Sequence, residues 1–262
     1  MRLSLIVSTY NNPAPLEAIF ARLAADDSGK PFEVIVADDG SRSATRELIE
    51  KWVKQAPFPI KHAWHEDIGF RKTRILNIAI TKTEGAYVVF LDGDCLPGRN
   101  FVADHIALAE HGTFVQGRRA FVDEKKVADL LAGRTTVLKL ALTGHVSGLF
   151  KAIRWPMPII KRNQEQRGLI GCNLAIWRED LVAVNGFDEA YEGWGIGEDS
   201  DLCSRLYHLG RQRKFVYGRA LVFHLNHPQL DKKHVPESLR RLEETIKTKK
   251  NRCEKGLNTH QP

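Results

Sequence analysis

Hydrophobic and polar positions follow two periods in the first half of the chain. Four short apolar runs have the length and composition of buried strands: residues 3–8, 32–39, 60–65 and 86–91. Three stretches between them place apolar residues at helical spacing: residues 15–25, 44–55 and 73–82. This alternation predicts an α/β fold, with a mostly parallel central sheet covered by helices. Because ligands bind outside the carboxyl ends of strands in such sheets, polar residues at those ends are the first candidates for a site.

The pattern changes in the second half. Between about residues 134 and 162 the alternation stops, and five apolar residues recur at helical spacing: Leu131, Leu138, Leu142, Leu149 and Ile153. We expect this stripe to pack on the core, with contact to a membrane surface or an acceptor molecule as the alternative. The apolar run at residues 171–177 follows, then a short helix-like stretch at 178–184 and strand-like runs at 213–218 and 220–227. Residues 236–256 begin with a helical pattern.

Composition sets the broad class of protein. With 262 residues and 43% hydrophobic content, the chain can bury a substantial core. Its four cysteines form no CxxC pair, and no apolar leader precedes the first strand-like run. We therefore expect a reduced, cytoplasmic protein. No apolar run approaches the length that crosses a bilayer, because the longest runs are only strand-sized.

Charge is unevenly distributed along the chain. The net charge is +7, but residues 205–262 hold 14 Lys and Arg against 5 Asp and Glu. Such a basic end can meet anionic lipid headgroups or nucleic acid, whereas a solvated charged helix is the alternative. A peripheral contact of this tail with anionic membrane, at the inner face of the cell membrane, is left open. No nucleic-acid partner is expected.

Two aspartates separated by one glycine follow the run at residues 86–91. Asp92 and Asp94 repel each other at this separation, so they persist where a cation or hydrogen-bond donors hold them. Carboxylate oxygens suit Mg²⁺ or Mn²⁺ bound together with substrate phosphates. An ordinary Asp-Gly-Asp turn around Gly93 is the alternative, and the three residues alone do not decide between the two.

Further polar residues end the first two strand-like runs. Thr9, Tyr10 and Asn11 follow the first run, and Asp38 and Asp39 end the second. Carboxylates at such a position can accept hydrogen bonds from the ribose or the base of a nucleotide. Capping of the next helix by Asp39 is the alternative, and both roles are compatible.

A basic cluster follows a glycine at residue 69. Arg71, Lys72 and Arg74 can face a diphosphate there, or they can form a solvated helix face. The chain has no GxxxxGK[ST] phosphate loop, and residues 193–199 do not fit the spacing of GxGxxG. Nucleotide binding must therefore depend on acidic groups, a metal ion and side chains.

The stretch GWGIGEDSD at residues 193–201 combines three glycines and Trp194 with three acidic residues, ahead of an amphipathic pattern. A carboxylate at a helix N-terminus is stabilised as the anion, so it can act ionised near neutral pH. An aromatic ring offers an apolar face to a sugar ring, with core packing as the alternative.

Together these motifs resemble the family 2 glycosyltransferases, which are inverting enzymes of the GT-A fold that use nucleotide-diphosphate sugars. The resemblance runs through SLIVSTYNNP, VIVADDGS, DIGFRKTRILNIAI, FLDGDCLP and the segment from GCNLAIW to FHLNHP, most of residues 3–228. The later part is similar to the β-1,4-galactosyltransferases and bacterial chondroitin-type polymerases. The resemblance implies a glycosyltransferase domain over residues 1–228, with a nucleotide-sugar half at 1–120 and an acceptor half at 165–228. A basic helical tail would follow at 229–262.

The resemblance also implies roles for individual residues. The donor nucleotide would be bound by residues at the strand ends and the basic cluster: Thr9, Tyr10, Asn11, Asp38, Asp39, Arg71, Lys72, Arg74, Asp92 and Gly93. A divalent cation, Mn²⁺ or Mg²⁺, would be held by Asp94 and His224, with His227 as the competing ligand. Asp199 would take the proton of the acceptor hydroxyl, while Glu198 would hydrogen-bond a sugar and Trp194 would contact the acceptor.

The implied activity is transfer of a hexose from a nucleotide-diphosphate sugar, a UDP-sugar in the first instance, to a hydroxyl of a growing glycan. Lipopolysaccharide core or capsule assembly, on a glycan or lipid-linked glycan acceptor, is the setting that the resemblance suggests. One departure is that GWGIGED is one residue longer than the GWGGED of galactosyltransferases, which puts the register between Trp194 and the acidic residues in doubt. The alternatives are a sugar-nucleotide nucleotidyltransferase and a basic nucleic-acid-binding module.

Overall fold

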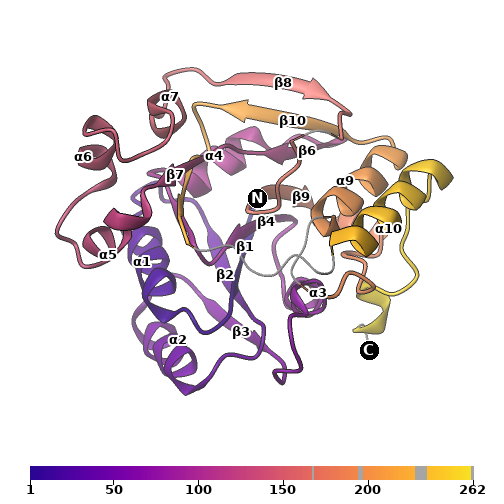
Figure 1. Ribbon diagram of the computed structural model, residues 1–262, viewed down its shortest axis with the longest axis horizontal. Helices are drawn as coiled ribbons and strands as arrows, with labels where there is room; N and C mark the ends of the chain where they lie inside the picture. The colour runs from indigo at the N-terminus through magenta and orange to yellow at the C-terminus, as the bar shows by residue number, and fades with distance from the viewer. Residues whose placement is uncertain (167, 194–196, 228–234, 261–262) are drawn as a thin grey trace.

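A central sheet of eight strands organises the molecule (Figure 1). The computed structural model describes residues 1–166, 168–193, 197–227 and 235–260. In spatial order the strands are β3 (Ile60–Trp64), β2 (Phe32–Asp38), β1 (Leu3–Thr9), β4 (Tyr87–Asp92), β9 (Asn173–Trp177), β6 (Thr113–Gln116), β10 (Gln212–Tyr217) and β8 (Ile159–Asn163). The first four are mutually parallel, β6 and β10 are parallel to each other, and β9 and β8 run antiparallel to their neighbours. The predicted mostly parallel α/β sheet is therefore confirmed.

Helices cover both faces of this sheet, which explains the nearly continuous apolar runs of its central strands. The helices of the first half are α1 (Pro13–Ala24), α2 (Ser43–Gln55), α3 (Lys72–Thr81) and α4 (Phe101–Leu108), and α8 (Arg178–Ala183) and α9 (Glu198–His208) follow later. Side chains alternate across β1, so that Leu5 and Val7 pack with Phe20 of α1 in one core. Ile6 faces the other core, with Ile75 of α3 and Leu202 of α9.

A second, three-stranded sheet brings distant segments together. Its order is β5 (Cys95–Pro97), β11 (Val222–Leu225) and β7 (Arg119–Val122). The register pairs His224 with Cys95 on one side and with Phe121 on the other, and the Leu225 amide donates to the Asp94 carbonyl at 2.8 Å. This small sheet therefore carries His224 to the carboxyl end of β4.

The segment before β8 corrects one expectation. It consists of three short helices, α5 (Glu124–Leu131), α6 (Val137–Leu142) and α7 (Leu149–Ala152). Glycines with positive φ interrupt the chain between them, at Gly133, Gly144 and Gly148, so one helical period is not maintained. Leu131 packs partly against the core, but Leu138 and Leu142 are 67% and 72% exposed and Ile153 is 43% exposed. The predicted core-facing stripe is therefore wrong for those three residues, and the Leu149 side chain lies outside the described part of the structure.

The C-terminal residues pack against the rest of the chain. Helix α10 (Val235–Thr248) contacts α9, in agreement with the helical pattern expected there. Beyond it Cys253 and Leu257 are buried, and the short 3₁₀ helix η1 (Leu257–Thr259) contacts α3. Among the described residues, no helix combines the length and the apolar composition needed to span a membrane.

Candidate active site

A cavity of about 200 Å³ lies at the carboxyl ends of β1, β2 and β4. Thr9, Tyr10, Asp39, Lys72 and Asp92 are among its lining residues, and Gly93 and Asp94 complete one wall. We call this hollow the strand-end cavity. The Thr9 hydroxyl is buried there and makes no hydrogen bond within the described chain. Its hydrogen-bonding capacity is therefore unused within the described chain.

The two aspartates that end β2 have different surroundings. Asp38 is fully buried, accepts from the Ser41 amide at 2.8 Å and lies 2.9 Å from His62 Nε2. Burial alone would raise the pKa of Asp38, but these hydrogen bonds outweigh it and hold the pKa below its usual value. Asp39 reaches the cavity, with its oxygens 2.6 Å from His65 Nε2 and 3.0 Å from the Arg71 amide.

A second cavity, of about 430 Å³, adjoins the first and shares Lys72, Asp92, Asp94 and His227 with it. We call it the carboxylate cavity. The residues that line only this second cavity come from β7, β11, the segment before β9 and the start of α9: Arg119, Phe121, Leu169, Ile170, Gly171, Cys172, Gly197, Glu198, Asp199, Ser200, His224 and Asn226.

Asp94, His224 and His227 form a group with the chemistry of a metal site. One ligand atom from each lies within 4.8 Å of the others. Asp94 Oδ2 is 2.9 Å from His227 Nε2 and 3.3 Å from His224 Nε2. Both histidines that the sequence left as competitors therefore converge on the same carboxylate. Carboxylate oxygens and imidazole nitrogens are both ligands of divalent transition metals, so these residues fit a divalent cation.

Lys72 connects the two cavities. Its Nζ lies 2.7 Å from Asp92 Oδ1, and the Ser8 hydroxyl donates to the same oxygen at 3.1 Å. Burial alone would lower the pKa of Lys72, but the carboxylates of Asp92, Asp199 and Glu198 raise it well above its usual value. Lys72 is therefore charged, and it acts as the common counter-ion of carboxylates from β4 and α9.

The acidic residues at the start of α9 lie in two different environments. Gly197 precedes the helix with φ of 142°, which glycine adopts readily. Asp201 turns inward, 2.8 Å from Arg205 Nε, and is buried in a structural ion pair. Glu198 and Asp199 line the carboxylate cavity instead. Burial and the neighbouring Asp199 raise the pKa of Glu198 to about 7, and burial also raises the pKa of Asp199.

Gly171 packs directly against the Asp199 carboxylate. A Cβ atom at this position would lie 2.1 Å from Asp199 Oδ1, which is far inside van der Waals contact. We expect Gly171→Ala to displace the Asp199 carboxylate. Where Asp199 takes the acceptor proton, as the resemblance implies, turnover should fall up to about a hundredfold, because small misplacements of reacting groups are costly. Donor affinity should stay unchanged, since the strand-end cavity does not include Gly171. Kinetics and ligand titration on the same variant measure both effects; wild-type turnover would contradict the role given to this glycine.

Four of the expected donor-binding residues line neither of these two cavities. Asn11 adopts φ of 48° and accepts from the Arg42 amide, which makes it a turn residue. Asp38 lies beneath the cavity, and the Arg71 guanidinium donates to the Glu66 carbonyl. Arg74 is the clearest correction, because it pairs with the buried Glu189 rather than facing a diphosphate.

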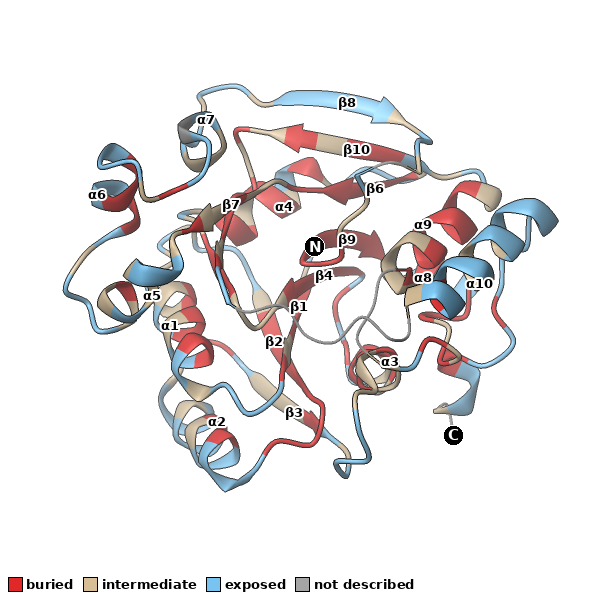
Figure 2. Ribbon diagram, viewed as in Figure 1, coloured by how far each residue is buried: buried red, intermediate tan, exposed pale blue. Residues whose placement is uncertain are grey.

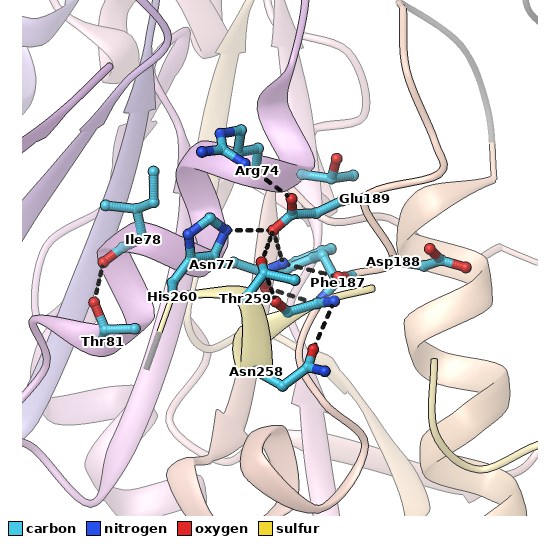
Figure 3. A network of polar contacts seen from close by, with 12 residues as sticks. Arg74, Asn77, Ile78, Thr81, Phe187, Asp188, Glu189, Asn258, Thr259 and His260 are labelled. Atoms are coloured by element: carbon cyan, nitrogen blue, oxygen red, sulfur yellow. Dashed lines mark hydrogen bonds and ion pairs between the residues drawn. The ribbon is translucent and has the colours of Figure 1, made fainter. Parts of the chain in front are cut away.

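Figure 3 shows the polar network around Glu189 in which Arg74 takes part. Glu189 accepts from Asn77 of α3 at 3.0 Å, and it also contacts Thr259 and His260 near the C-terminus. Helical geometry explains the difference from Lys72, since residues two apart on a helix point in different directions. Trp194, the expected acceptor contact, lies outside the described residues, so its role remains a prediction.

Residues in the cavity walls and behind them had no distinct signal in the sequence. Arg119 follows Arg118 in a basic dipeptide, and only the pairing of β7 with β11 places it beside the carboxylate cavity. His62 lies in β3, which pairs with β2, and contacts Asp38, whereas His65 follows β3 and contacts Asp39. The positions of such residues depend on pairing between strands that are distant in the sequence, which no local sequence pattern indicates.

Two adjoining cavities at strand ends, with a metal-ligand group where they meet and paired carboxylates in the second, are features of a nucleotide-sugar transferase of the GT-A type. Comparison with known proteins agrees. Residues 4–181 match the model of glycosyl transferase family 2, and residues 157–228 match the model described as N-terminal domain of galactosyltransferase. The chain therefore belongs to glycosyl transferase family 2. This membership favours glycosyl transfer over nucleotidyl transfer or nucleic-acid binding.

Relatives and solved structures place the chain within this class. It is 27% identical over 243 residues to the chondroitin synthase of Escherichia coli, with 86% of this chain and 35% of that protein covered. The chain thus spans about a third of that relative's length. The fold is similar to S. aureus TarS 1–349 in complex with UDP-GlcNAc, with TM-score 0.66, 17% identity and coverage of 95% and 66%. It is also similar to the mannosyltransferase PcManGT from Pyrobaculum calidifontis in complex with GDP-Man and Mn²⁺, with TM-score 0.58, 18% identity and coverage of 87% and 57%.

Proposed function

We propose that this chain is an inverting, metal-dependent hexosyltransferase that moves a sugar from a UDP-sugar to a hydroxyl of a growing surface glycan of the lipopolysaccharide core or capsule type. The observation that carries the proposal is the adjacency of the two cavities: Asp94 and His227 line both, and the carboxylate cavity also holds His224, Glu198 and Asp199. The complexes of TarS with UDP-GlcNAc and of PcManGT with GDP-Man and Mn²⁺ support the donor class.

Charge in the two cavities supports a bound cation. The lining carboxylates are Asp39, Asp92, Asp94, Glu198 and Asp199, whereas the lining Lys and Arg residues in the described chain are Lys72 and Arg119. A diphosphate would add further negative charge to this excess. A divalent cation on Asp94, His224 and His227 would offset the negative charge that grows on the departing diphosphate. The two imidazole nitrogens favour Mn²⁺ over Mg²⁺, which prefers oxygen ligands.

The residues of the strand-end cavity would orient the donor. Asp39 accepts hydrogen bonds from the nucleoside, Thr9 offers its unpartnered hydroxyl, and Tyr10 flanks the opening with 51% exposure. Lys72 holds Asp92 toward the sugar end of the donor. These contacts fix the anomeric carbon, so that one face is turned to the carboxylate cavity and the other to the leaving diphosphate.

Asp199 would perform the proton transfer. It accepts the proton of the acceptor hydroxyl as the hydroxyl oxygen forms its bond to the anomeric carbon, and the bond from that carbon to the diphosphate oxygen breaks with the electron pair leaving on the diphosphate. Attack from the face opposite the leaving group inverts the configuration. Glu198, beside Asp199, would hydrogen-bond the acceptor.

The pKa shifts predict an acidic limit on activity. A carboxylate accepts a proton only when it is ionised, and burial raises the pKa of Glu198 to about 7 and raises that of Asp199. We therefore expect kcat/KM to fall as the pH drops through the pKa of Asp199, which burial raises above the ordinary carboxyl range, and to level off above it. A pH profile with saturating metal ion measures this. A rate that stays constant down to the ordinary range of a carboxyl pKa, near 4, would contradict it.

Donor binding is the direct test of the proposal. A panel of nucleotide sugars, screened by thermal shift with Mn²⁺ present, should show stabilisation by one nucleoside class, because a ligand of the native state raises its stability. Product analysis then separates the reaction classes. A glycosyltransferase releases a nucleoside diphosphate, whereas a nucleotidyltransferase releases pyrophosphate. Failure of every nucleotide sugar to shift the melting temperature would overturn the proposal.

A further inference from the structure

Residues 130–164 carry an unusual surface. The stretch contains six Lys and Arg residues and no Asp or Glu. At the chain's average of 32 acidic residues in 262, a stretch of this length would hold about four. The six cations are Arg134, Lys139, Lys151, Arg154, Lys161 and Arg162. We call this surface, which includes α6, α7 and β8, the 130–164 face.

Large apolar side chains are exposed among these cations. Phe150 and Met157 are 77% and 80% exposed, Leu142 is 72% exposed and Ile159 is 51% exposed. Of the 15 large hydrophobic residues exposed in the described chain, seven belong to this stretch, which is about an eighth of the sequence. Figure 2 shows β8 exposed along its length, with α6 and α7 at the same outer margin of the molecule. Clustered exposure of this kind marks an interaction surface.

The exposed side chains sit on backbone that the core holds in place. Arg154 binds the buried carboxylate of Asp104 through two nitrogens, at 2.7 and 3.1 Å. The Trp155 amide donates to the Gly218 carbonyl at 2.9 Å. The Trp155 ring packs so closely on Gly218 that a Cβ there would lie 2.6 Å from it. The fold therefore presents the apolar residues outward rather than leaving them on an unattached loop.

The 130–164 face also contacts the backbone of a strand that lines the carboxylate cavity. Phe121 lines that cavity, and its backbone exchanges hydrogen bonds with Ser147, whose hydroxyl accepts from the Phe121 amide at 2.9 Å and whose amide donates to the Phe121 carbonyl at 2.8 Å. Val122 pairs with Val146 next to them. An acceptor bound in the cavity would therefore lie close to whatever the 130–164 face contacts.

We propose that the 130–164 face docks on an anionic lipid bilayer. Apolar side chains that enter the headgroup region, together with Lys and Arg attracted to anionic lipids, are the two components of interfacial binding. Arg134, Arg154 and Arg162 pair with acidic residues outside the stretch. Lys139, Lys151 and Lys161 form no ion pair within the described chain, and these three cations favour a negatively charged surface over a neutral one. This inference rests on the proposed function in one respect: bilayer docking would bring the carboxylate cavity to a lipid-linked acceptor.

The basic C-terminal helix is a weaker candidate for the same role. In α10 the cations alternate with acidic residues, and Arg240 and Arg241 both pair with Glu237. Lys250, after the helix, pairs with Glu254. These pairs reduce the attraction of α10 to an anionic surface. We therefore assign the membrane contact to the 130–164 face instead of the C-terminal tail.

Vesicle co-sedimentation tests the proposal with the full chain. We expect binding to phosphatidylcholine vesicles that contain phosphatidylglycerol, weaker binding at high salt because salt screens charge, and little binding to phosphatidylcholine alone. Two independent variants should each lose most of this binding, by about tenfold or more: Leu142→Ser/Phe150→Ser/Met157→Ser removes the apolar component, and Lys139→Glu/Lys151→Glu/Lys161→Glu removes the charge. The matched control, Lys247→Glu/Lys249→Glu/Lys250→Glu, changes charge equally and should retain binding.

Several outcomes would overturn the proposal. These are failure of the wild type to bind anionic vesicles, equal binding to neutral vesicles, and loss of binding in the C-terminal control equal to that in the face variants. A dimer in the wild type that the face variants dissociate, measured by sedimentation velocity, would assign the face to a second copy instead. Thermal shift with donor and Mn²⁺ should be unchanged in the face variants. Failure of donor binding in the wild type would reject the proposed function and leave the vesicle result unaffected.

Discussion

Asp199→Asn is expected to reduce sugar transfer by about a hundredfold to ten-thousandfold, the range typical of a removed general base. The amide keeps the size of the side chain but cannot accept the proton of the acceptor hydroxyl. Donor binding should change little, since Asp199 lines the carboxylate cavity and not the strand-end cavity. Initial rates at saturating donor and Mn²⁺, with the thermal melting curve of the variant, measure the effect and confirm the fold.

Glu198→Gln is the matched control for Asp199→Asn. Both residues lie in the first turn of α9 and line the same cavity, but Glu198 is assigned to hydrogen bonding, which an amide also provides. The control should therefore retain more activity than Asp199→Asn. If the Asp199→Asn protein turned over near the wild-type rate and Glu198→Gln were inactive, the two roles would be reversed.

Asp94→Asn is expected to reduce transfer by on the order of a hundredfold or more, through loss of the metal ion that offsets diphosphate charge. Asp94 is the carboxylate shared by His224 and His227, so its loss removes the anionic ligand of the group. Chelator treatment of the wild type should have the same effect, and Mn²⁺ should restore activity. Rates measured against Mn²⁺ concentration give the metal affinity of each protein.

Two histidine variants provide the comparison for the metal site. His224→Ala should weaken Mn²⁺ activation, because the His224 ring nitrogen lies 3.3 Å from Asp94 Oδ2. His111→Ala should leave activation unchanged, since His111 stacks on Trp177 outside both cavities. Indifference of the wild type to chelator would reject the metal role of Asp94.

The sequence predicted best which residues gather at the strand ends. Asp39, Asp92 and Asp94 follow buried strands, and the parallel sheet brings such ends together, so local pattern and fold agree. The start of α9 also followed from local signals, because glycine and acidic residues precede an amphipathic period. Those signals did not reveal that Asp201 turns inward to Arg205 while Asp199 faces the cavity.

The sequence predicted cavity residues less well where the direction of a side chain, or the pairing of distant strands, determines which residues reach the cavities. Lys72 and Arg74 are two residues apart, yet only Lys72 reaches the cavities, because α3 turns Arg74 toward Glu189. His224 and His227 converge on Asp94 only through the pairing of β11 with β5. The exposed residues of the 130–164 face had helical spacing, but positive-φ glycines divided the helix and left Leu138 and Leu142 outward.

Titration calorimetry tests most directly whether Asp94 holds the metal ion and Asp199 takes the proton. The nucleoside diphosphate identified in the donor screen is titrated, with Mn²⁺ present, into the wild type, Asp199→Asn and Asp94→Asn. The wild type and Asp199→Asn should bind it with Kd values that agree within about threefold, a difference under 1 kcal/mol. Asp94→Asn should bind at least about tenfold more weakly. Equal weakening in both variants, or unchanged affinity in Asp94→Asn, would contradict the assignment of the metal to Asp94 and of the proton to Asp199.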